Sequence, residues 1–334
     1  MRWKSILLFT LTITLQATGQ SLPDTAMVLA KNTAIYELVI SQNGRVIFRH
    51  TYNGQQPDTL HNSQSLTKSI MSVLIGIAID KGYIADPDQE IGQWFPELAK
   101  DPDARKQHIT LHQIMDQASG LWHENLEGGL GEYLSQANPS QYVLAQPLLD
   151  APGTVFHYNN AATHLLSVIL TKATGMPVTN FAQRFLFSKL GIQHADWKKM
   201  NDGYDDGAGL RSVYLSTAAI NKIGNLLLQE GQYNGQTIVS RKWARMLMQP
   251  PLTRATGWGF TGSQYALCWY HVRYDGQPVT YGMGWGGQYM IIIPGLKAVI
   301  AVHEWVNDTT AVQQALYFEQ SVFPLLWKYL QTKK

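Results

Sequence analysis

The chain has 334 residues, with 26 Lys and Arg, 24 Asp and Glu, and a net charge of +2 at pH 7. This balance excludes the basic stripe that nucleic-acid binding requires. The single cysteine, Cys268, excludes an internal disulfide, so the stability of the fold depends on its core. The 10 Trp and 16 Tyr are many. Aromatic residues at this density often line clefts for apolar or extended ligands, although core packing alone explains many of them.

The N-terminus has the layout of a secretory signal peptide. A basic head, Met1–Lys4, precedes the apolar run Ser5–Leu15 and the small residues Ala17–Gly19. The apolar run is too short to span a membrane. We therefore expect residues 1–19 to be removed before Gln20, leaving a periplasmic or secreted protein without stable membrane insertion. A retained N-terminal anchor is the alternative. No cysteine follows the run, so we expect no lipid at the new N-terminus.

The next segments predict a hairpin and then a buried helix. Apolar stretches at 35–40 and 46–50 flank Asn43-Gly44, a dipeptide typical of tight hairpin turns. The run 69–82 is apolar nearly all round and ends in Lys-Gly, which indicates a buried helix of about four turns.

The middle of the chain is predicted to be helical and its last third to form strands. Between residues 87 and 210, helical segments are expected at 111–115, 142–149, 161–174 and 181–190. After a helix at 217–224, strands are expected at 266–274, 279–281, 288–293 and 296–303. This order predicts an α+β or α/β sandwich: one antiparallel sheet flanked by helices, built from residues 20–86 and 211–334, with a helical insertion over 87–210.

Ser65-Leu66-Thr67-Lys68 leads directly into the predicted buried helix. Residues three apart share a helix face, so Lys68 would place its amino group one turn from the Ser65 hydroxyl. A serine hydroxyl needs a base to become a good nucleophile, and a lysine among apolar neighbours can be that base. Free N–H groups at a helix start also stabilise nearby negative charge. The alternative is a helix cap followed by a surface lysine, but this is the only S-x-x-K in the sequence.

Two further stretches contain candidate site residues. Tyr158 and Asn160 follow a Pro-Gly turn and precede a predicted helix, so they can either cap that helix or supply a proton shuttle and a polar positioning group. The segment Gly282–Gln288 contains four glycines before a strand. Such a segment allows close backbone approach to a ligand, and a β-bulge is the ordinary alternative.

Together these residues resemble the serine β-lactamase-like superfamily of class C β-lactamases, D-alanyl-D-alanine peptidases and related esterases. Ser65-x-x-Lys68, Tyr158-x-Asn160 and the glycine-rich strand start occur in the order and at about the spacing of that superfamily. Additional stretches are most similar to its 6-aminohexanoate-dimer hydrolase branch. These are residues 67–69, 109–121, 189–192 and 284–288, the last followed by Ile292-Ile293-Pro294. The resemblance covers roughly residues 33–327.

The resemblance implies a role for each matching residue and no cofactor or metal. Ser65 would be the acylated nucleophile, and Lys68 and Tyr158 the bases that deprotonate it and later activate water. Asn160 would position polar groups. Gln288, after Gly287, would share the oxyanion hole with Ser65 through its backbone N–H.

One departure from the superfamily pattern bears on the substrate. Where its β-lactamases and peptidases carry Lys-Thr-Gly, this chain is expected to carry Trp285-Gly286-Gly287, without a cation for a substrate carboxylate. We therefore expect an esterase or amidase that acts on a small ester or amide through an acyl-enzyme. Arg211 or Arg254 can instead supply the missing charge. A β-lactamase or D-Ala-D-Ala carboxypeptidase remains the alternative.

Other classes of protein fit the sequence less well. His157, His164 or His303 can be drawn into a Ser-His-Asp triad, but the chain has no G-x-S-x-G motif. His108 and His112 have metal-ligand spacing, yet H-E-x-x-H is absent and no third ligand is evident. An inactive cell-wall or partner-binding module is the non-enzymatic alternative, and the intact Ser65, Lys68 and Tyr158 argue against it.

Overall fold

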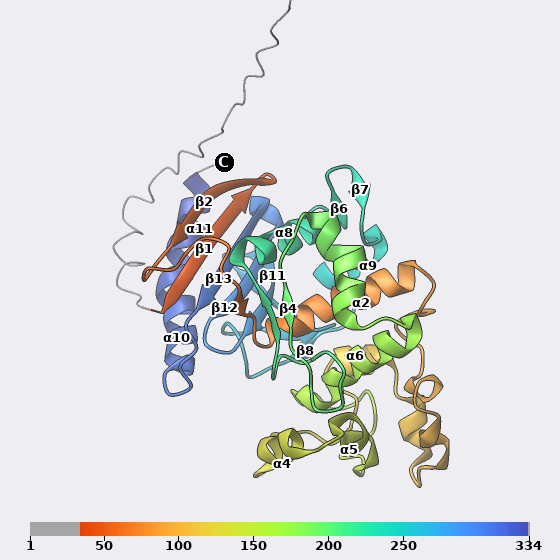
Figure 1. Cartoon of the computed structure of the whole chain (residues 1–334). Coiled ribbons are helices and arrows are strands. Elements are labelled where there is room, and N and C mark those ends of the chain that lie inside the picture. Colours follow the sequence, from red (N-terminus) through yellow and green to blue (C-terminus); the bar gives the residue numbers. More distant parts are fainter. Residues whose placement is uncertain (1–33, 333–334) are drawn as a thin grey trace, which may run out of the picture.

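The computed structural model describes residues 34–332 (Figure 1). Its centre is an eight-stranded antiparallel sheet with strand order β2-β1-β13-β12-β11-β10-β9-β8. The strands are β1 (Ile35–Gln42), β2 (Arg45–Thr51), β8 (Arg254–Ala255), β9 (Gln264–Ala266), β10 (Trp269–Tyr274), β11 (Gln277–Gly284), β12 (Gln288–Ile293) and β13 (Ala298–Glu304). The predicted fold class is confirmed: a single antiparallel sheet combines both ends of the described chain.

Helices cover both faces of this sheet (Figure 1). One face carries α2 and α8, and the other carries α10 and α11. The helices are α2 (Leu66–Asp80), α3 (Leu111–Met115), α4 (Gly129–Ser135), α5 (Pro139–Ala145), α6 (Asn160–Thr174), α7 (Val178–Ala182), α8 (Thr217–Leu228), α9 (Arg241–Met248), α10 (Ala311–Tyr317) and α11 (Phe323–Thr332). In the sequence, helices α3 to α7 come after β1 and β2 and before the other strands of this sheet. In space, α6 packs against α2.

The central strands bury side chains on both faces, because successive residues of a strand point to opposite sides. In β12, Met290 and Ile292 join the core beneath α2 and α8, whereas Ile291 and Ile293 join the core beneath α11. These strands therefore read as nearly continuous apolar runs, which is typical of a sheet covered on both faces.

A small three-stranded sheet connects the residues just before α2 to the segment that follows α7 in the sequence. It pairs β3 (His61–Asn62) with β5 (Val213–Leu215), and β5 with β4 (Asp196–Trp197). Because β3 ends three residues before Ser65, this pairing brings the loop before β5 alongside the predicted nucleophile. A separate two-residue hairpin, β6 (Gln232–Tyr233) with β7 (Gln236–Thr237), lies at the surface.

The strand predicted over residues 266–274 is wrong as a single element. Leu267 and Cys268 adopt positive φ angles of 51° and 69°, and the chain reverses there into the β9–β10 hairpin. The apolar pattern concealed this turn because it contains neither Gly nor Pro. Cys268 is a buried free thiol, and burial raises its pKa to about 12.

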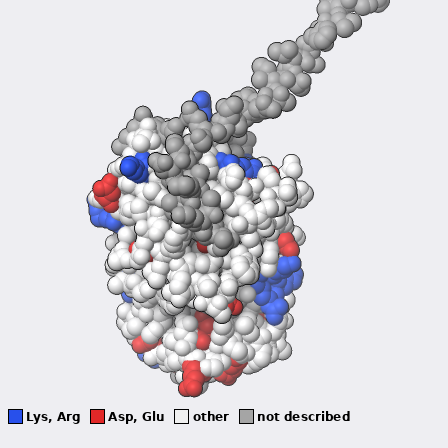
Figure 2. Space-filling view, turned by 90° about the vertical axis from the view of Figure 1, so that its left-hand side faces the viewer, with Lys and Arg blue, Asp and Glu red and all other residues white. Residues whose placement is uncertain are grey.

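Two further features of the protein are the charge on one of its faces and the length of its helices. On the face shown in Figure 2, Lys and Arg lie in small separate groups within a mostly uncharged surface. Within residues 34–332, no helix is both long and apolar enough to cross a membrane. The signal peptide predicted over residues 1–19 lies outside the described residues.

Gly76 allows α2 to pack closely against α9, and this contact gives a test of the fold. A Cβ atom at Gly76 would lie 2.0 Å from the buried ring of Trp243, whose Nε1 donates to the Ser72 carbonyl at 3.0 Å. We expect Gly76→Ala to lower the free energy of unfolding by about 1–3 kcal/mol, although Ala is the better helix former. Urea unfolding monitored by Trp fluorescence measures the change.

The matched control for this test is Gly131→Ala in α4. Nothing lies within 4 Å of a Cβ atom at Gly131, so only helix propensity acts there. We expect this variant to gain up to about 1 kcal/mol. Equal effects of the two substitutions would show that the contact with Trp243 does not limit α2.

Candidate active site

Ser65 stands immediately before the first residue of α2, with φ −64° and ψ −9°. Its side chain does not cap the helix, so the hydroxyl is left for another partner. Lys68, one turn later, places its Nζ 3.2 Å from the Ser65 Oγ. The side chains therefore meet as the S-x-x-K spacing predicts.

Lys68 is buried, with an exposed fraction of 1%. Besides Ser65, its Nζ contacts the Asn160 Oδ1 at 2.5 Å and the backbone carbonyl of Ala208. It also lies 4.7 Å from the centre of the Tyr158 ring. These contacts come from three separate segments of the chain. The amino group is thus held at one place beside the Ser65 hydroxyl.

Tyr158 lies two residues before α6, on the same side of Lys68 as the cavity. Its ring meets Tyr265 edge to face with centres 6.1 Å apart, and its carbonyl accepts a hydrogen bond from the Asn125 amide at 2.5 Å. Tyr270 is a further neighbour that the sequence did not indicate. Burial, followed by the nearby Tyr158, raises the pKa of Tyr270 well above its ordinary value. Tyr270 therefore remains a neutral phenol beside Tyr158.

Asn160 is the first residue of α6, and a buried carboxylate fixes its orientation. The Glu124 Oε1 accepts from the Asn160 backbone N–H at 2.9 Å and from its Nδ2 at 2.5 Å, and Oε2 accepts from the Ala161 N–H at 3.2 Å. Because Glu124 takes the amide hydrogens, the Asn160 carbonyl oxygen faces Lys68. Glu124 also places negative charge at a helix N-terminus, where it is stabilised. Sequence analysis missed Glu124, since no spacing relates it to Asn160.

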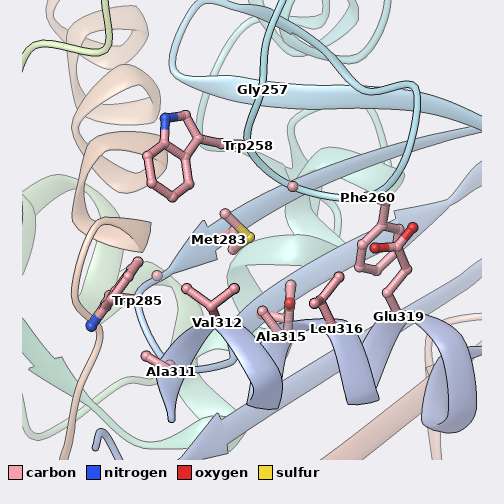
Figure 3. Close-up of a pocket in the computed structure, with 14 residues that line it drawn as sticks. Gly257, Trp258, Phe260, Met283, Trp285, Ala311, Val312, Ala315, Leu316 and Glu319 are labelled. Carbon is pink, nitrogen blue, oxygen red and sulfur yellow. The ribbon is translucent and has the colours of Figure 1, made fainter. Parts of the chain in front are cut away.

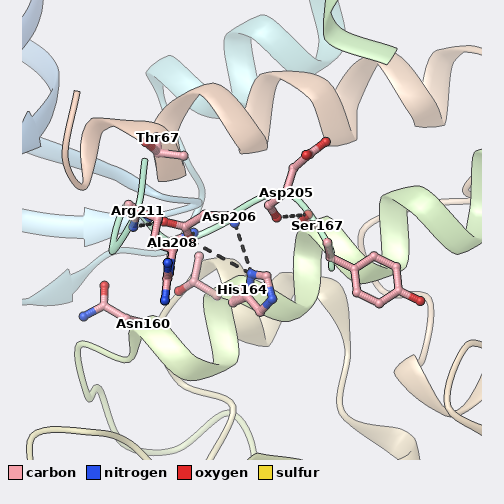
Figure 4. A network of polar contacts seen from close by, with 12 residues as sticks. Thr67, Asn160, His164, Ser167, Asp205, Asp206, Ala208 and Arg211 are labelled. Atoms are coloured by element: carbon pink, nitrogen blue, oxygen red, sulfur yellow. Dashed lines mark hydrogen bonds and ion pairs between the residues drawn. The ribbon is translucent and has the colours of Figure 1, made fainter. Parts of the chain in front are cut away.

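The Ala208 carbonyl belongs to a loop that is organised by Asp206 (Figure 4). The Asp206 carboxylate accepts from four backbone N–H groups, those of Ala208, Gly209, Arg211 and Ser212, at 2.5–3.1 Å. His164 supports the loop from α6, where its Nδ1 accepts from the Gly207 N–H at 3.2 Å and its Nε2 pairs with Asp202 at 3.0 Å. The loop is therefore held at its backbone, independently of any substrate.

Two glycines allow the surrounding backbone to approach Ser65 closely. A Cβ atom at Gly209, where φ is +94°, would lie 2.3 Å from the Gln64 carbonyl. A Cβ atom at Gly284 would lie 2.5 Å from the Ser63 carbonyl. The end of β11 therefore abuts the segment that carries Ser65.

A cavity of about 500 Å³ opens at Ser65. Its lining comes from segments that lie far apart in the sequence: Gln64, Ser65, Asn125, Leu130, Tyr158, Asn160, Gly209, Leu210, Trp258, Tyr270, Met283, Trp285 and Asp308. Asp308 is the one charged side chain in this lining, within the described residues, and it accepts a hydrogen bond from the Trp285 Nε1 at 3.1 Å.

The structure brings Trp285 to this cavity but not Gly287 or Gln288. Gln288 is completely buried, and its amide nitrogen donates to the carbonyl of Glu304 at 2.9 Å. It begins β12 and pairs with Gly284, one strand away from Ser65. Gln288, predicted to belong to the oxyanion hole, therefore does not line the cavity, and the residue that follows the end of β11 and does line it is Trp285.

The other candidate residues lie away from Ser65. Arg211 donates to the Asn201 side chain at 2.9 Å and Arg254 to the Gly153 carbonyl at 2.8 Å, and neither lines the cavity. The histidines considered for a triad have other partners: His157 pairs with Asp150, His164 with Asp202, and His303 with Thr217. His108 and His112 contact separate carboxylates, and residues 34–332 contain no group of three or more potential metal ligands.

Ser65 and Tyr158 thus line one cavity, and the buried Lys68 Nζ lies next to both of them. The family model described as beta-lactamase matches residues 33–315. The chain belongs to the β-lactamase family.

Individual relatives agree with this assignment. The chain is 25% identical over 315 residues to the 6-aminohexanoate-dimer hydrolase of Paenarthrobacter ureafaciens, covering 89% of this chain and 79% of the relative. A D-stereospecific amidohydrolase from a Streptomyces species has the same fold, with a TM-score of 0.68, 14% identity, and coverage of 91% of this chain and 99% of that protein. A class C β-lactamase superimposes with a TM-score of 0.62, 17% identity and coverage of 88% and 95%.

The dependence of the site on Asp206 can be tested by Asp206→Asn. An Asn amide offers one acceptor oxygen and turns donor hydrogens toward N–H groups, so the substitution is expected to reduce stability by about 2–3 kcal/mol. Displacement of the Ala208 carbonyl should also slow labelling of Ser65 by a fluorophosphonate. Thermal unfolding and the labelling rate of the folded variant measure the two effects.

Asp58→Asn is the control for Asp206→Asn, because Asp58 makes an exposed ion pair with Arg49 at 2.9 Å. Its loss should change stability by less than about 1 kcal/mol and leave labelling unchanged. An Asp206→Asn variant with normal stability and labelling would contradict the role given to this carboxylate.

Proposed function

We propose that the protein is an exported serine hydrolase that cleaves a small ester or amide through an acyl-enzyme on Ser65. The observation that carries this proposal is the buried Lys68 Nζ, 3.2 Å from the Ser65 Oγ and next to the Tyr158 ring. Lys68 and Tyr158 act together as the base. The proton leaves Ser65 as its oxygen attacks the substrate carbonyl, and it passes to the departing alcohol or amine. Water, activated by the same pair, then releases the acid and regenerates Ser65.

The negative charge of the tetrahedral intermediate requires donors beside Ser65. Within residues 34–332, neither the Ser65 N–H nor the Trp285 N–H has a hydrogen-bond acceptor. Ser65 begins α2 and Trp285 follows the end of β11, so we assign these two N–H groups to the oxyanion hole. The N-terminus of α2 adds its partial positive charge.

The charges of the cavity favour substrates without a carboxylate beside the scissile bond. No Lys or Arg is among its lining residues, and Asp308 would repel an anion. Two unit charges 4 Å apart interact by about 1 kcal/mol in water, and by more in a partly desolvated cavity. The names of two relatives, a 6-aminohexanoate-dimer hydrolase and a D-stereospecific amidohydrolase, support an amide as one substrate type.

Export is part of the proposal and rests on the layout of residues 1–19. N-terminal sequencing of the protein recovered from the native host would test it, with Gln20 as the expected first residue. A chain that begins at Met1 would contradict export by this route.

The nucleophile is tested by Ser65→Ala. This variant should lose essentially all hydrolysis of model esters and all fluorophosphonate labelling, because Ser65 is the one serine hydroxyl within the described residues that is hydrogen-bonded to the Lys68 Nζ. The fold should survive, since the Ser65 side chain does not cap α2. Circular dichroism supplies the folding control. Turnover retained by a folded Ser65→Ala variant would reject the proposed function.

The shared role of the two bases is tested by a double-mutant cycle. Lys68→Ala and Tyr158→Phe should each reduce kcat by roughly a hundredfold or more, the usual scale for proton-transfer groups. If they act as one unit, the double variant should be little worse than either single variant. Losses that multiply would instead indicate two independent functions.

The preference against carboxylates is tested at Trp285 with two substrates that differ only in a carboxylate beside the scissile bond. The wild-type protein should prefer the neutral substrate. Trp285→Lys should narrow the difference in kcat/KM by about tenfold or more, because a charge-assisted hydrogen bond contributes roughly 1.5–3 kcal/mol. A folded variant with an unchanged ratio would show that Trp285 does not set this preference.

A further inference from the structure

A second chamber lies beside the Ser65 cavity and has no part in the mechanism described above (Figure 3). Its volume is about 170 Å³. The two cavities share Trp258, Met283 and Trp285 in their linings. These three side chains form the boundary between the two spaces, so the chamber begins where the Ser65 cavity ends.

The chamber is apolar on nearly every side. Buried Tyr289 lines it from β12 and buried Phe260 from the loop before β9, and α10 contributes Val312, Ala315 and Leu316 from the opposite side (Figure 3). Its one charged lining residue, within the described part of the chain, is Glu319. The Glu319 Oε1 accepts from the Thr261 N–H at 2.6 Å.

Large apolar side chains around this chamber remain exposed to solvent. The exposed fractions are 48% for Trp258, 37% for Trp285, 49% for Val312 and 45% for Leu316. The Trp258 and Trp285 rings also meet edge to face with centres 6.3 Å apart. Single exposed apolar residues are common, but a cluster around a concave space next to the Ser65 cavity marks a candidate ligand site.

We infer that this chamber binds an apolar arm of the substrate, an alkyl or aryl group that ends without a carboxylate. This inference rests on the proposed function and specifies its substrate class. An apolar arm would cover the exposed rings and displace water from the α10 face. A carboxylate at its end would instead meet Glu319 or Asp308, the charged side chains of the two linings.

Two series of esters test the chamber in the wild-type protein. In one, p-nitrophenyl esters vary in acyl length from acetate to octanoate. In the other, acetate esters vary in the length of the alcohol. In the series whose arm enters the chamber, kcat/KM should rise up to about fourfold for each methylene until the space is filled. The responding series identifies whether the arm belongs to the acyl or the leaving group.

An ω-carboxylate on the longest arm of the responding series tests the charge requirement. We expect kcat/KM to fall at least tenfold relative to the uncharged ester of the same length. Equal values for the two esters would overturn the exclusion of carboxylates.

Filling the chamber supplies the decisive variant. Ala315→Phe adds a ring to the chamber side of α10, so the ratio of kcat/KM for the long and short esters should fall at least tenfold. Gln313→Phe adds the same ring at an exposed position of α10 that does not line the chamber, and should leave the ratio unchanged. If Ala315→Phe does not fold, Val312→Phe places the ring at a lining position that is already exposed.

The outcomes separate this inference from the proposed function. If no ester is hydrolysed and Ser65 is not labelled, the proposed function fails. If esters are hydrolysed but neither series depends on chain length, the proposed function survives and the inference is overturned. The inference is also overturned if folded Ala315→Phe and Gln313→Phe variants give the same ratio.

Discussion

The site depends on one constraint: a lysine amino group placed inside the protein must be fully hydrogen-bonded. An unpaired charge in a protein interior costs several kcal/mol, so the chain has to surround Lys68 with acceptors. These come from three separate segments, namely the Ser65 hydroxyl, the Asn160 side chain and the Ala208 carbonyl. The requirement therefore joins the first turn of α2, the first turn of α6 and the loop before β5. The geometry that satisfies Lys68 also places it against the nucleophile.

Carboxylates behind these acceptors hold them in place. Glu124 orients Asn160, and Asp206 gathers four backbone N–H groups around the loop that presents Ala208. Both carboxylates are buried, and each is stabilised by several donors, which is the usual condition for a charge in a protein interior. Neither carboxylate contacts the Lys68 Nζ directly; each acts on the groups that surround it. A direct pair would occupy the amino group that has to serve Ser65.

Periodicity and spacing predicted much of this arrangement from the sequence. The apolar run after Ser65 identified α2. The spacing of three residues predicted that the Lys68 amino group lies next to the Ser65 hydroxyl. Glu124 and Asp206 could not be found in this way, because their partners are backbone N–H groups in irregular segments. The position of Gln288 relative to the cavity could not be predicted for a similar reason. Four glycines between residues 282 and 287 left the position of the strand end open. The pairing of Gly284 with Gln288 shows that β11 ends at Gly284, and the close approach of Gly284 to the Ser63 carbonyl puts that end beside the segment of Ser65.

The end of β11 links the chemistry to the choice of substrate. Its last residue, Gly284, approaches the Ser63 carbonyl so closely that no side chain fits, and the Trp285 N–H that we assign to the oxyanion hole follows it directly. The side chains on either side of Gly284, Met283 and Trp285, border both the Ser65 cavity and the chamber at α10. In the function we propose, the backbone of this short segment therefore supplies an N–H group to the oxyanion hole, whereas its side chains line the two cavities. The backbone position is set by packing against α2, whereas the side chains can vary in size and charge without moving the N–H groups. Such a division allows related proteins with one fold to differ in substrate while they keep the same nucleophile.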